Sequence, residues 1–134
     1  MPLNRIFVDT SAWYAMIDKN DRDHAAAVTK IKILDRPLVT SNYILDEILT
    51  LVKSKLGSTV AVPFGQKLWD QEISALLRVT EEDEERAWRI FRQYNDKGFS
   101  FTDCTSFALM ERLDMKTVFA FDDHFLQYGR FAIL

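Results

Sequence analysis

Cysteine is scarce in this sequence, and long apolar runs are missing. Cys104 is the only cysteine among 134 residues, so no intrachain disulfide can form, which favours a reducing compartment such as the cytoplasm. No apolar stretch approaches the roughly 20 residues that a membrane-spanning helix needs, and the apolar segment near the N-terminus is too short for the core of a secretory signal. We therefore expect a cytoplasmic protein without a membrane span.

Positive charge is not in excess either. The 17 Lys and Arg residues are outnumbered by 20 Asp and Glu residues, which gives a formal net charge of -3. The overall basic footprint that is typical of nucleic-acid-binding proteins is therefore missing. This total still allows a local basic face, and a cluster of metal-binding carboxylates would itself make the total more negative.

Histidine occurs only twice, as His24 and His124. Two histidines so far apart in the sequence make a poor zinc site, because zinc takes several nitrogen or sulfur ligands. His124 follows Asp122 closely enough to support a site there. The favoured interpretation is nevertheless that the side chain of His124 is exposed to solvent.

The order of the predicted elements indicates the fold class. The sequence has no internal repeat, low-complexity tract or Ser/Gly-rich linker, so we expect one domain over residues 1–134. Apolar runs predict strands at residues 5–8, 37–40, 73–79, 117–121 and 131–134. Helical spacing and capping residues predict helices at residues 10–17, 24–34, 44–56, 58–71, 80–96 and 102–113. Because strands alternate with helices, we expect an α/β fold with a central, mainly parallel sheet.

Acidic residues stand at the ends of the predicted strands and at the starts of the helices that follow. Asp9 directly follows the first strand, and Asp122 directly follows the strand at 117–121. Asp46 and Glu47 lie in the first turns of a helix and differ by about 100° around its axis, so one of them should face inward. Asp103 opens the helix at 102–113. Since parallel strands end at the same edge of a sheet, we expect these carboxylates to converge there.

Converging carboxylates repel one another unless a cation neutralises them. Mg²⁺ and Mn²⁺ prefer such oxygen ligands, and they assist the hydrolysis of phosphodiesters. Each acid also has a purely structural explanation, because an Asp after a strand is often a helix cap or a turn residue. Asp103 in particular could serve only the dipole of its helix.

Four segments together resemble a known family. They are VDTSAW at 8–13, TSNYILDEILTLV at 40–52, FSFTDCTSFALM at 99–110 and VFAFDDHF at 118–125. In this order and at this chain length they resemble a PIN domain, and within that family the VapC-type ribonucleases of toxin–antitoxin pairs. The resemblance covers nearly the whole chain. It implies a flattened α/β/α sandwich.

The resemblance also implies roles for individual residues. The acids that match the catalytic, metal-binding acids of the family are Asp9, Glu47, Asp103 and Asp122. Asp46 is the alternative to Glu47, and Asp123 is an additional acid that could support or replace Asp122. Hydroxyl groups near the site could hold a bound water or a phosphate, and those that fit are Thr10, Ser11 and Ser106. For Thr10 and Ser11, helix capping is an equally good explanation.

The function that the resemblance implies is an Mg²⁺- or Mn²⁺-dependent endoribonuclease that acts on RNA. It further implies a homodimer and a cognate antitoxin protein that blocks the active site. Two alternatives stay open. One is a PIN-fold nuclease that processes RNA without an antitoxin, and the other is a non-catalytic module that binds RNA or protein.

A basic series also needs an explanation. Arg86, Arg89 and Arg92 repeat every three residues within the predicted helix at 80–96, just after an acidic run at 81–85. Ion pairs within the helix are the favoured interpretation. A ridge that contacts phosphate groups is the alternative.

Overall fold

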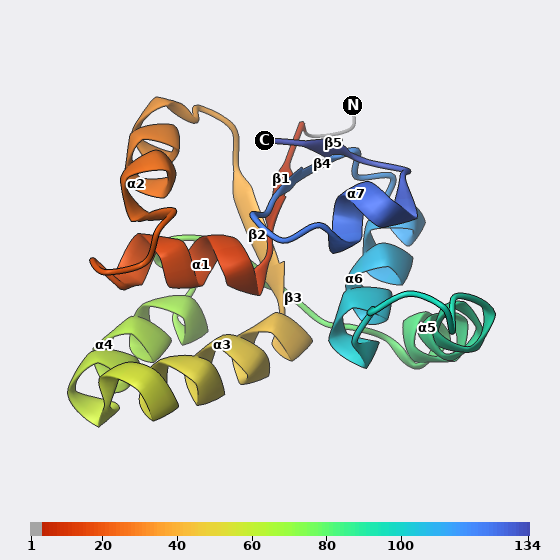
Figure 1. The fold of residues 1–134 in the computed structure, drawn as a ribbon, viewed down its shortest axis with the longest axis horizontal. Helices are drawn as coiled ribbons and strands as arrows, with labels where there is room; N and C mark the ends of the chain where they lie inside the picture. Colours follow the sequence, from red (N-terminus) through yellow and green to blue (C-terminus); the bar gives the residue numbers. More distant parts are fainter. Residues whose placement is uncertain (1–3) are drawn as a thin grey trace.

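A five-stranded sheet forms the centre of the computed structural model, which describes residues 4–134 (Figure 1). The strands are β1 (Ile6–Val8), β2 (Leu38–Ser41), β3 (Ala75–Leu77), β4 (Thr117–Phe119) and β5 (Ala132–Ile133). Their order is β3-β2-β1-β4-β5, and every neighbouring pair is parallel. The expected α/β fold with a parallel sheet is confirmed, as is the final edge strand.

Helices cover both faces of this sheet. The helices are α1 (Thr10–Ile17), α2 (His24–Ile33), α3 (Asn42–Leu56), α4 (Ser58–Trp69), α5 (Glu81–Gln93), α6 (Phe101–Arg112) and α7 (His124–Tyr128). Figure 1 shows α1–α4 on one side of the sheet and α5–α7 on the other. This follows from right-handed crossovers, because the chain adds β2 and β3 on one side of β1 and then returns to add β4 on the other. The result is an α/β/α sandwich.

The middle of the sheet is apolar because helices shield both of its faces. Ile6, Phe7 and Val8 of β1 are all completely buried, and so are Val118 and Phe119 of β4. A strand covered on two faces reads as an unbroken apolar run rather than an alternating one. In the part of the chain that the structure describes, no helix is both long and apolar enough to cross a membrane.

Most predicted boundaries shift by one to three residues for local reasons. The strand predicted at 73–79 is confined to Ala75–Leu77, since its partner β2 ends at Ser41 and the chain there turns into α3. The helix predicted from residue 102 begins at Phe101, because Ser100 caps it and accepts a hydrogen bond from the backbone N–H of Asp103. The helix predicted to reach residue 96 ends at Gln93.

Helix α7 was not predicted at all. It spans only five residues, His124–Tyr128, and Gly129 ends it in the left-handed conformation with φ of 80°. So short a helix carries no readable periodicity. It is held instead by tertiary packing, in which Tyr128 stacks on Phe107 of α6 with ring centroids 4.2 Å apart.

Candidate active site

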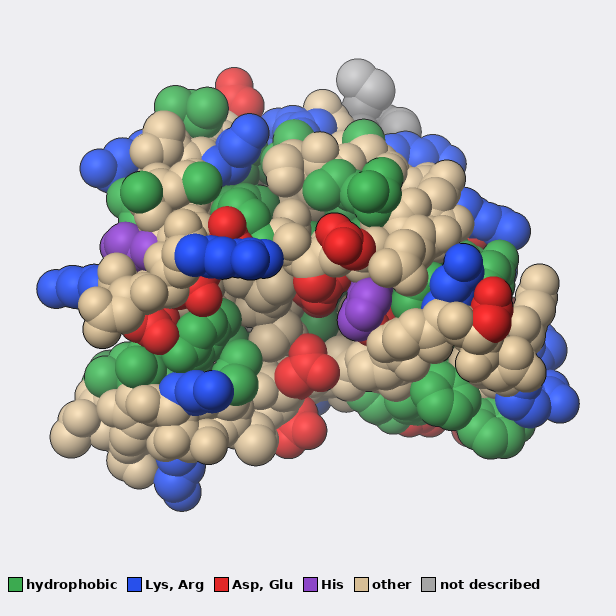
Figure 2. All heavy atoms as spheres, in the orientation of Figure 1, with side chains coloured by type: hydrophobic (Ala, Val, Ile, Leu, Met, Phe, Trp, Pro, Cys, Tyr) green, Lys and Arg blue, Asp and Glu red, His purple; other side chains and the backbone are tan. Residues whose placement is uncertain are grey.

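The predicted acids meet where the strand order reverses. The chain builds the sheet outward from β1 in both directions, so β1 and β4 flank the switch point, where α/β proteins form a crevice for ligands. Asp9 stands directly after β1, and its backbone N–H donates to the carbonyl of Phe119 in β4 at 3.0 Å. Figure 2 shows Asp and Glu side chains and a histidine gathered in the middle of the molecule, between the two groups of helices.

Asp9 combines a structural role with an unusual electrostatic position. It is the N-cap of α1, and its Oδ2 accepts hydrogen bonds from the backbone N–H and the hydroxyl of Ser11 at 3.2 and 2.6 Å. Its side chain is almost completely buried. Burial, together with the nearby charges of Asp122 and Asp103, raises the pKa of Asp9 to about 8, although the hydrogen bonds from Ser11 oppose this shift. A cation bound beside Asp9 would stabilise its ionised form in this buried position.

The hydroxyls after Asp9 act on other parts of the site rather than as caps. Ser11 donates to Asp9 and accepts from the backbone N–H of Phe121 at 2.9 Å, so it ties the end of β1 to the loop after β4. Thr10 donates to Oε1 of Glu47 at 2.5 Å. Because Asp9 caps α1 itself, the interpretation of Thr10 and Ser11 as helix caps is wrong.

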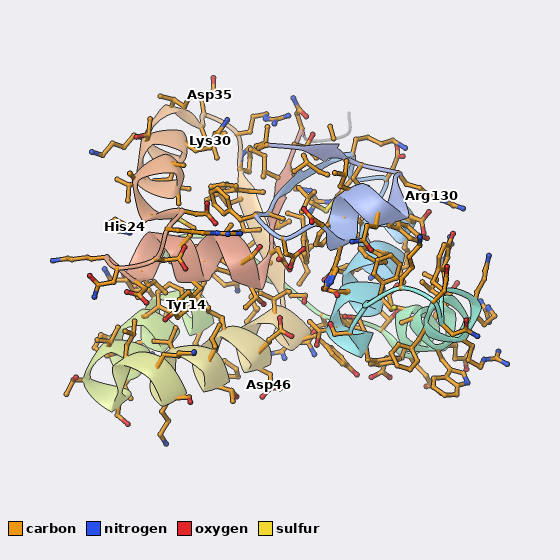
Figure 3. All side chains as sticks on the ribbon, viewed as in Figure 1. Tyr14, His24, Lys30, Asp35, Asp46 and Arg130 are labelled. Carbon is orange, nitrogen blue, oxygen red and sulfur yellow. The ribbon has the colours of Figure 1, made fainter. Side chains whose placement is uncertain are left out.

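Glu47, not Asp46, faces the other carboxylates. Glu47 is half-buried, and burial raises its pKa while the hydrogen bond from Thr10 opposes the increase. The charges of Asp103 and Asp122 raise this pKa further, which places all three groups within electrostatic reach of one another. Asp46 is exposed and projects away from the sheet (Figure 3).

Asp103 sits in a capping box at the start of α6. Its Oδ2 accepts from the backbone N–H of Ser100 at 2.9 Å, and its own N–H donates to the Ser100 hydroxyl at 3.0 Å. Burial raises the pKa of Asp103; the hydrogen bond from Ser100 and the charge of His124 oppose this shift, and Asp122 reinforces it. The sequence suggested that Asp103 serves the dipole of its helix; the structure gives it a place in the first turn, within the capping box, together with a place in the acidic cluster.

His124 belongs to the site, and the expectation that it is simply solvent-exposed is wrong. Its Nδ1 lies 2.6 Å from Oδ2 of Asp103 and 4.0 Å from Oδ1 of Asp122. Its ring packs edge-on against Phe99 with centroids 5.8 Å apart. The backbone N–H of His124 also donates to Asp122 at 3.0 Å. The unpredicted helix α7 explains the error, since the position of His124 at its start directs the ring inward.

Two of the supporting residues lie outside the cluster. Asp123 is exposed, unlike its neighbour Asp122, which is half-buried. Ser106 is completely buried on α6, and its hydroxyl donates to the carbonyl of Thr102 at 3.1 Å. Within residues 4–134 this is the hydrogen bond that occupies Ser106, so the structure gives it a role inside its own helix rather than beside the carboxylates.

The donor set fits a divalent cation. One ligand atom from each of Asp103, Asp122 and His124 lies within 4.8 Å of the others. Nδ1 of His124 is shielded from solvent and makes no hydrogen bond to any residue that the structure describes, despite its short distance to Asp103. Carboxylates that lie close together, with the pKa of Asp103 raised mainly by burial, and a ring nitrogen without a hydrogen bond are groups that a bound metal ion would satisfy. The carboxylate majority suits a hard cation, which prefers oxygen ligands.

Space for a substrate opens on two sides of these groups. One cavity of about 260 Å³ is lined in part by Ser11, Asp122 and Leu51. A second, of about 440 Å³, is lined in part by Glu47, Leu51 and Thr102. Leu51 of α3 borders both, so the two cavities are neighbours beside the acidic cluster.

Comparison with known proteins agrees with this geometry. The PIN domain matches residues 6–130. The 23S rRNA-specific endonuclease VapC20 of Mycobacterium tuberculosis is 33% identical over 127 residues, which cover 92% of this chain and 94% of that protein. The VapC ribonuclease of Archaeoglobus fulgidus is 28% identical over 88% of this chain and 77% of its own.

Solved structures show the same fold. The crystal structure of M. tuberculosis VapC20, described as a sarcin–ricin loop cleaving toxin, has a TM-score of 0.88 at 31% identity and covers 93% of this chain and 95% of its own. DNA-bound VapBC from Salmonella typhimurium has a TM-score of 0.69 at 14% identity, and the match covers 97% of this chain and 96% of that chain. This likeness shows the fold alone. The sheet order, the acids at the switch point and these matches lead to one conclusion: this chain belongs to the PIN domain family.

Proposed function

We propose that this protein is a divalent-metal-dependent endoribonuclease that hydrolyses phosphodiester bonds of RNA, as the toxin of a type II toxin–antitoxin pair. The observation that carries this proposal is the convergence of Asp9, Glu47, Asp103 and Asp122 from four separate segments on the sheet's switch point. The similarity to a relative named a 23S rRNA-specific endonuclease supports the substrate class, ribosomal RNA. An antitoxin, a homodimer and a cytoplasmic location belong to the same proposal.

The protein's own residues would hold Mg²⁺ or Mn²⁺ and orient the substrate. Asp9, Glu47, Asp103 and Asp122 would provide the oxygen ligands, and His124 would steady Asp103 or provide a further ligand. When bound, such an ion lowers the pKa of a water molecule and offsets negative charge on the phosphate in the transition state. Ser11 and Thr10 keep two of the carboxylates in fixed orientations through their hydrogen bonds.

The alternatives differ in what they predict. A nuclease without an antitoxin would show the same metal-dependent cleavage but would be indifferent to any small protein expressed with it. A binding module would hold RNA or protein and cut neither. All four acids are present, and the charges of Asp103 and Asp122 act on both Asp9 and Glu47, which supports the nuclease over the binding module.

Cleavage of RNA by the purified protein tests the proposal. With Mg²⁺ or Mn²⁺ we expect defined fragments from purified ribosomal RNA, and with a chelator none. The Glu47→Gln variant should cut at least about 100-fold more slowly, since it removes a charged ligand from the site. The Asp46→Asn variant is the matched control, because it changes the adjacent but exposed acid and should cut at nearly the wild-type rate.

Two outcomes would contradict the proposal, the first its metal dependence and the second its assignment of the active site. Cleavage that persists in the chelator would come from a metal-independent contaminant or mechanism. Equal rates for the Glu47→Gln and Asp46→Asn variants would show that the inward-facing acid has no special role.

Thr10 is a positioning residue for Glu47, and its hydroxyl can be tested alone. We expect Thr10→Val, which keeps the side chain's shape, to lower cleavage by about tenfold and to raise the Mg²⁺ concentration needed for half-maximal activity. The reason is that Glu47 loses its hydrogen-bond donor at 2.5 Å, and the bond that holds its pKa down disappears. Thr10→Ser keeps the hydroxyl and should retain most of the activity. A similar loss in both variants would instead point to packing.

A further inference from the structure

A second charged feature lies away from the acids, on the side of the molecule covered by α5 and α7. It is a cavity of about 300 Å³ whose lining includes Arg86, Arg89 and Arg130, together with the polar side chains of Gln93 and Tyr94. Arg86 and Arg89 come from α5, and Arg130 follows α7, as Figure 3 shows beside that helix. Segments more than 40 residues apart in the sequence thus bring three guanidinium groups to one cavity. Hereafter it is called the arginine pocket.

Two of these arginines are held by Glu111, which is not part of the lining of the cavity. Glu111 of α6 is largely buried, with a side chain 15% exposed. Its Oε1 accepts from Arg86 at 2.8 Å and from the hydroxyl of Tyr128 at 2.9 Å, and its Oε2 accepts from Arg130 at 3.0 Å. One carboxylate therefore orients two guanidinium groups toward the cavity. The arrangement is pre-formed, so a ligand would not have to order these side chains.

Positive charge remains in excess after this pairing. Arg89 makes neither an ion pair nor a hydrogen bond with any residue in the range 4–134. Three positive charges therefore face a cavity behind which one negative charge lies. The excess suits an anion, and guanidinium groups match the oxygens of phosphate with paired hydrogen bonds.

This geometry changes the interpretation of the basic series on α5. The favoured explanation was ion pairs with the preceding acids of the same helix. Arg86 instead pairs with Glu111 on α6, and Arg92 lies over the ring of Trp88, 5.7 Å from its centroid. The arginines at 86 and 89 face the cavity, whereas Arg92 is not part of its lining.

We propose that the arginine pocket binds a backbone phosphate of the RNA substrate at a distance from the bond that is cut. The inference rests on the proposed ribonuclease function and concerns where its RNA is held. The site of cleavage is rich in carboxylates, and without its metal ion it would repel a polyanion, so a positively charged surface elsewhere would add to the attraction for RNA. Glu111 lies eight residues after Asp103 on α6, about 12 Å along the helix. A folded RNA can therefore contact both ends of α6 at once.

RNA is favoured over an acidic protein segment by the charge pattern. Binding of a phosphate backbone requires no particular RNA sequence. It requires fixed positive charges whose hydrogen-bond donors reach the phosphate oxygens. The pocket offers three guanidinium groups, two of them held by Glu111, and its aromatic lining residue Tyr94 is of the kind on which bases stack.

The test measures RNA binding separately from cleavage. The Asp9→Asn protein serves as a non-cleaving background, and the probe is purified, end-labelled 23S ribosomal RNA. In this background Arg89→Gln should weaken binding by about tenfold, since it removes a charged hydrogen-bonding group. The slope of log affinity against log salt concentration should fall by about one, as for a lost phosphate contact. Arg92→Gln removes the same charge from the same helix outside the pocket and should change neither quantity.

Cleavage kinetics provide a second readout in proteins that keep Asp9. Arg89→Gln should raise KM with little effect on kcat, whereas damage to the active site would lower kcat. Arg89→Lys keeps the positive charge but loses the paired hydrogen-bond donors of the guanidinium group. Compared with Arg89→Gln, it should therefore restore the salt dependence of RNA binding more fully than the affinity. Since Arg89 is exposed and pairs with no described residue, thermal denaturation should show an unchanged Tm.

The outcomes separate this inference from the proposed function. If Arg89→Gln and Arg92→Gln bind RNA alike, or if no form of the protein binds it, the pocket is not an RNA site, whatever the cleavage assay shows. That result would leave an acidic protein segment as the next ligand to test. If the wild type cuts no RNA but Arg89→Gln still weakens RNA binding selectively, the nuclease assignment fails and the pocket stands.

Discussion

The Asp9→Asn protein should lose RNA cleavage and, in the absence of divalent metal, should be more stable than the wild type. Cleavage should fall at least about 1,000-fold, because a ligand charge disappears from the centre of the site. Asn is as good an N-cap as Asp, so α1 keeps its start. The substitution also removes a buried carboxyl group that desolvation and the charges of Asp122 and Asp103 keep from ionising, so folding no longer has to protonate it.

The stability gain should depend on pH in a defined direction. In the folded, metal-free protein the pKa of Asp9 is about 8, against 3.8 as its ordinary value, so the folded state holds a proton that the unfolded state releases. The contribution of Asp9 to the stability of the wild type should therefore be greatest below about pH 4 and should fall as the pH rises toward 8, by up to about 1.4 kcal/mol per pH unit. Asp9→Asn has no proton to lose there and should show a flatter curve.

Thermal denaturation in a chelator at a series of pH values between 4 and 8 measures this effect. Addition of Mg²⁺ at pH 8 should then raise the Tm of the wild type more than that of Asp9→Asn, since only the wild type has the complete site. Asp123→Asn, at an exposed acid beside the cluster, is the control and should keep the pH dependence of the wild type. If the wild type and Asp9→Asn showed the same pH dependence of stability, Asp9 would not be the group whose raised pKa causes it.

Arg112→Ala should destabilise the fold by about 3 kcal/mol, the largest loss of stability that we expect from a single surface-accessible side chain. Arg112 makes two hydrogen bonds to Asp83, from Nε at 2.7 Å and from a terminal nitrogen at 2.9 Å. Asp83 is 2% exposed and also closes the capping box of α5 through Thr80. Without Arg112 a buried carboxylate would remain beside α6 with no counter-charge.

Urea denaturation at pH 7 measures this loss, and Arg92→Ala, on the exposed face of α5, should change the free energy of unfolding by less than about 0.5 kcal/mol. Burial opposes ionisation of Asp83, but the hydrogen bonds from Arg112 and Thr80 outweigh it and lower the pKa of Asp83. The contribution of the pair is thus present above pH 4 and is lost as the pH falls below the ordinary pKa of Asp83. A loss under about 1 kcal/mol at pH 7 would mean that the pair is screened by solvent.

Local patterns predicted the sheet and its edge well. Ile6, Phe7 and Val8 form an unbroken apolar run, which is typical of a strand covered on both faces. Asp9 then caps a helix over residues 10–17, the bounds that the sequence predicted. Since parallel strands share an edge, the placement of Asp9 and Asp122 followed from the strand pattern alone. The choice of Glu47 over Asp46 needed the family resemblance, because a difference of 100° does not say which residue faces inward.

Contacts between distant segments could not be predicted in this way. The position of His124 depends on α7, a five-residue helix held by stacking of Tyr128 on Phe107. The partner of Arg86 is Glu111, on a different helix 25 residues away, whereas the acids of its own helix were nearer in sequence. In both cases tertiary packing decided between local possibilities that were similar in energy.

The position of β4 next to β1 also has a consequence for synthesis. The central strand forms from residues 6–8, but its neighbour forms from residues 117–119, and Asp122 follows that neighbour. A ribosome delivers the chain from the N-terminus, so an incomplete chain carries Asp9, Glu47 and Asp103 without the strand and the acid that complete their site. Such a nascent chain, attached to a particle made largely of RNA, has no assembled centre with which to cut it. Competence to cleave therefore begins only after residues 117–122 have been synthesised and β4 has paired with β1.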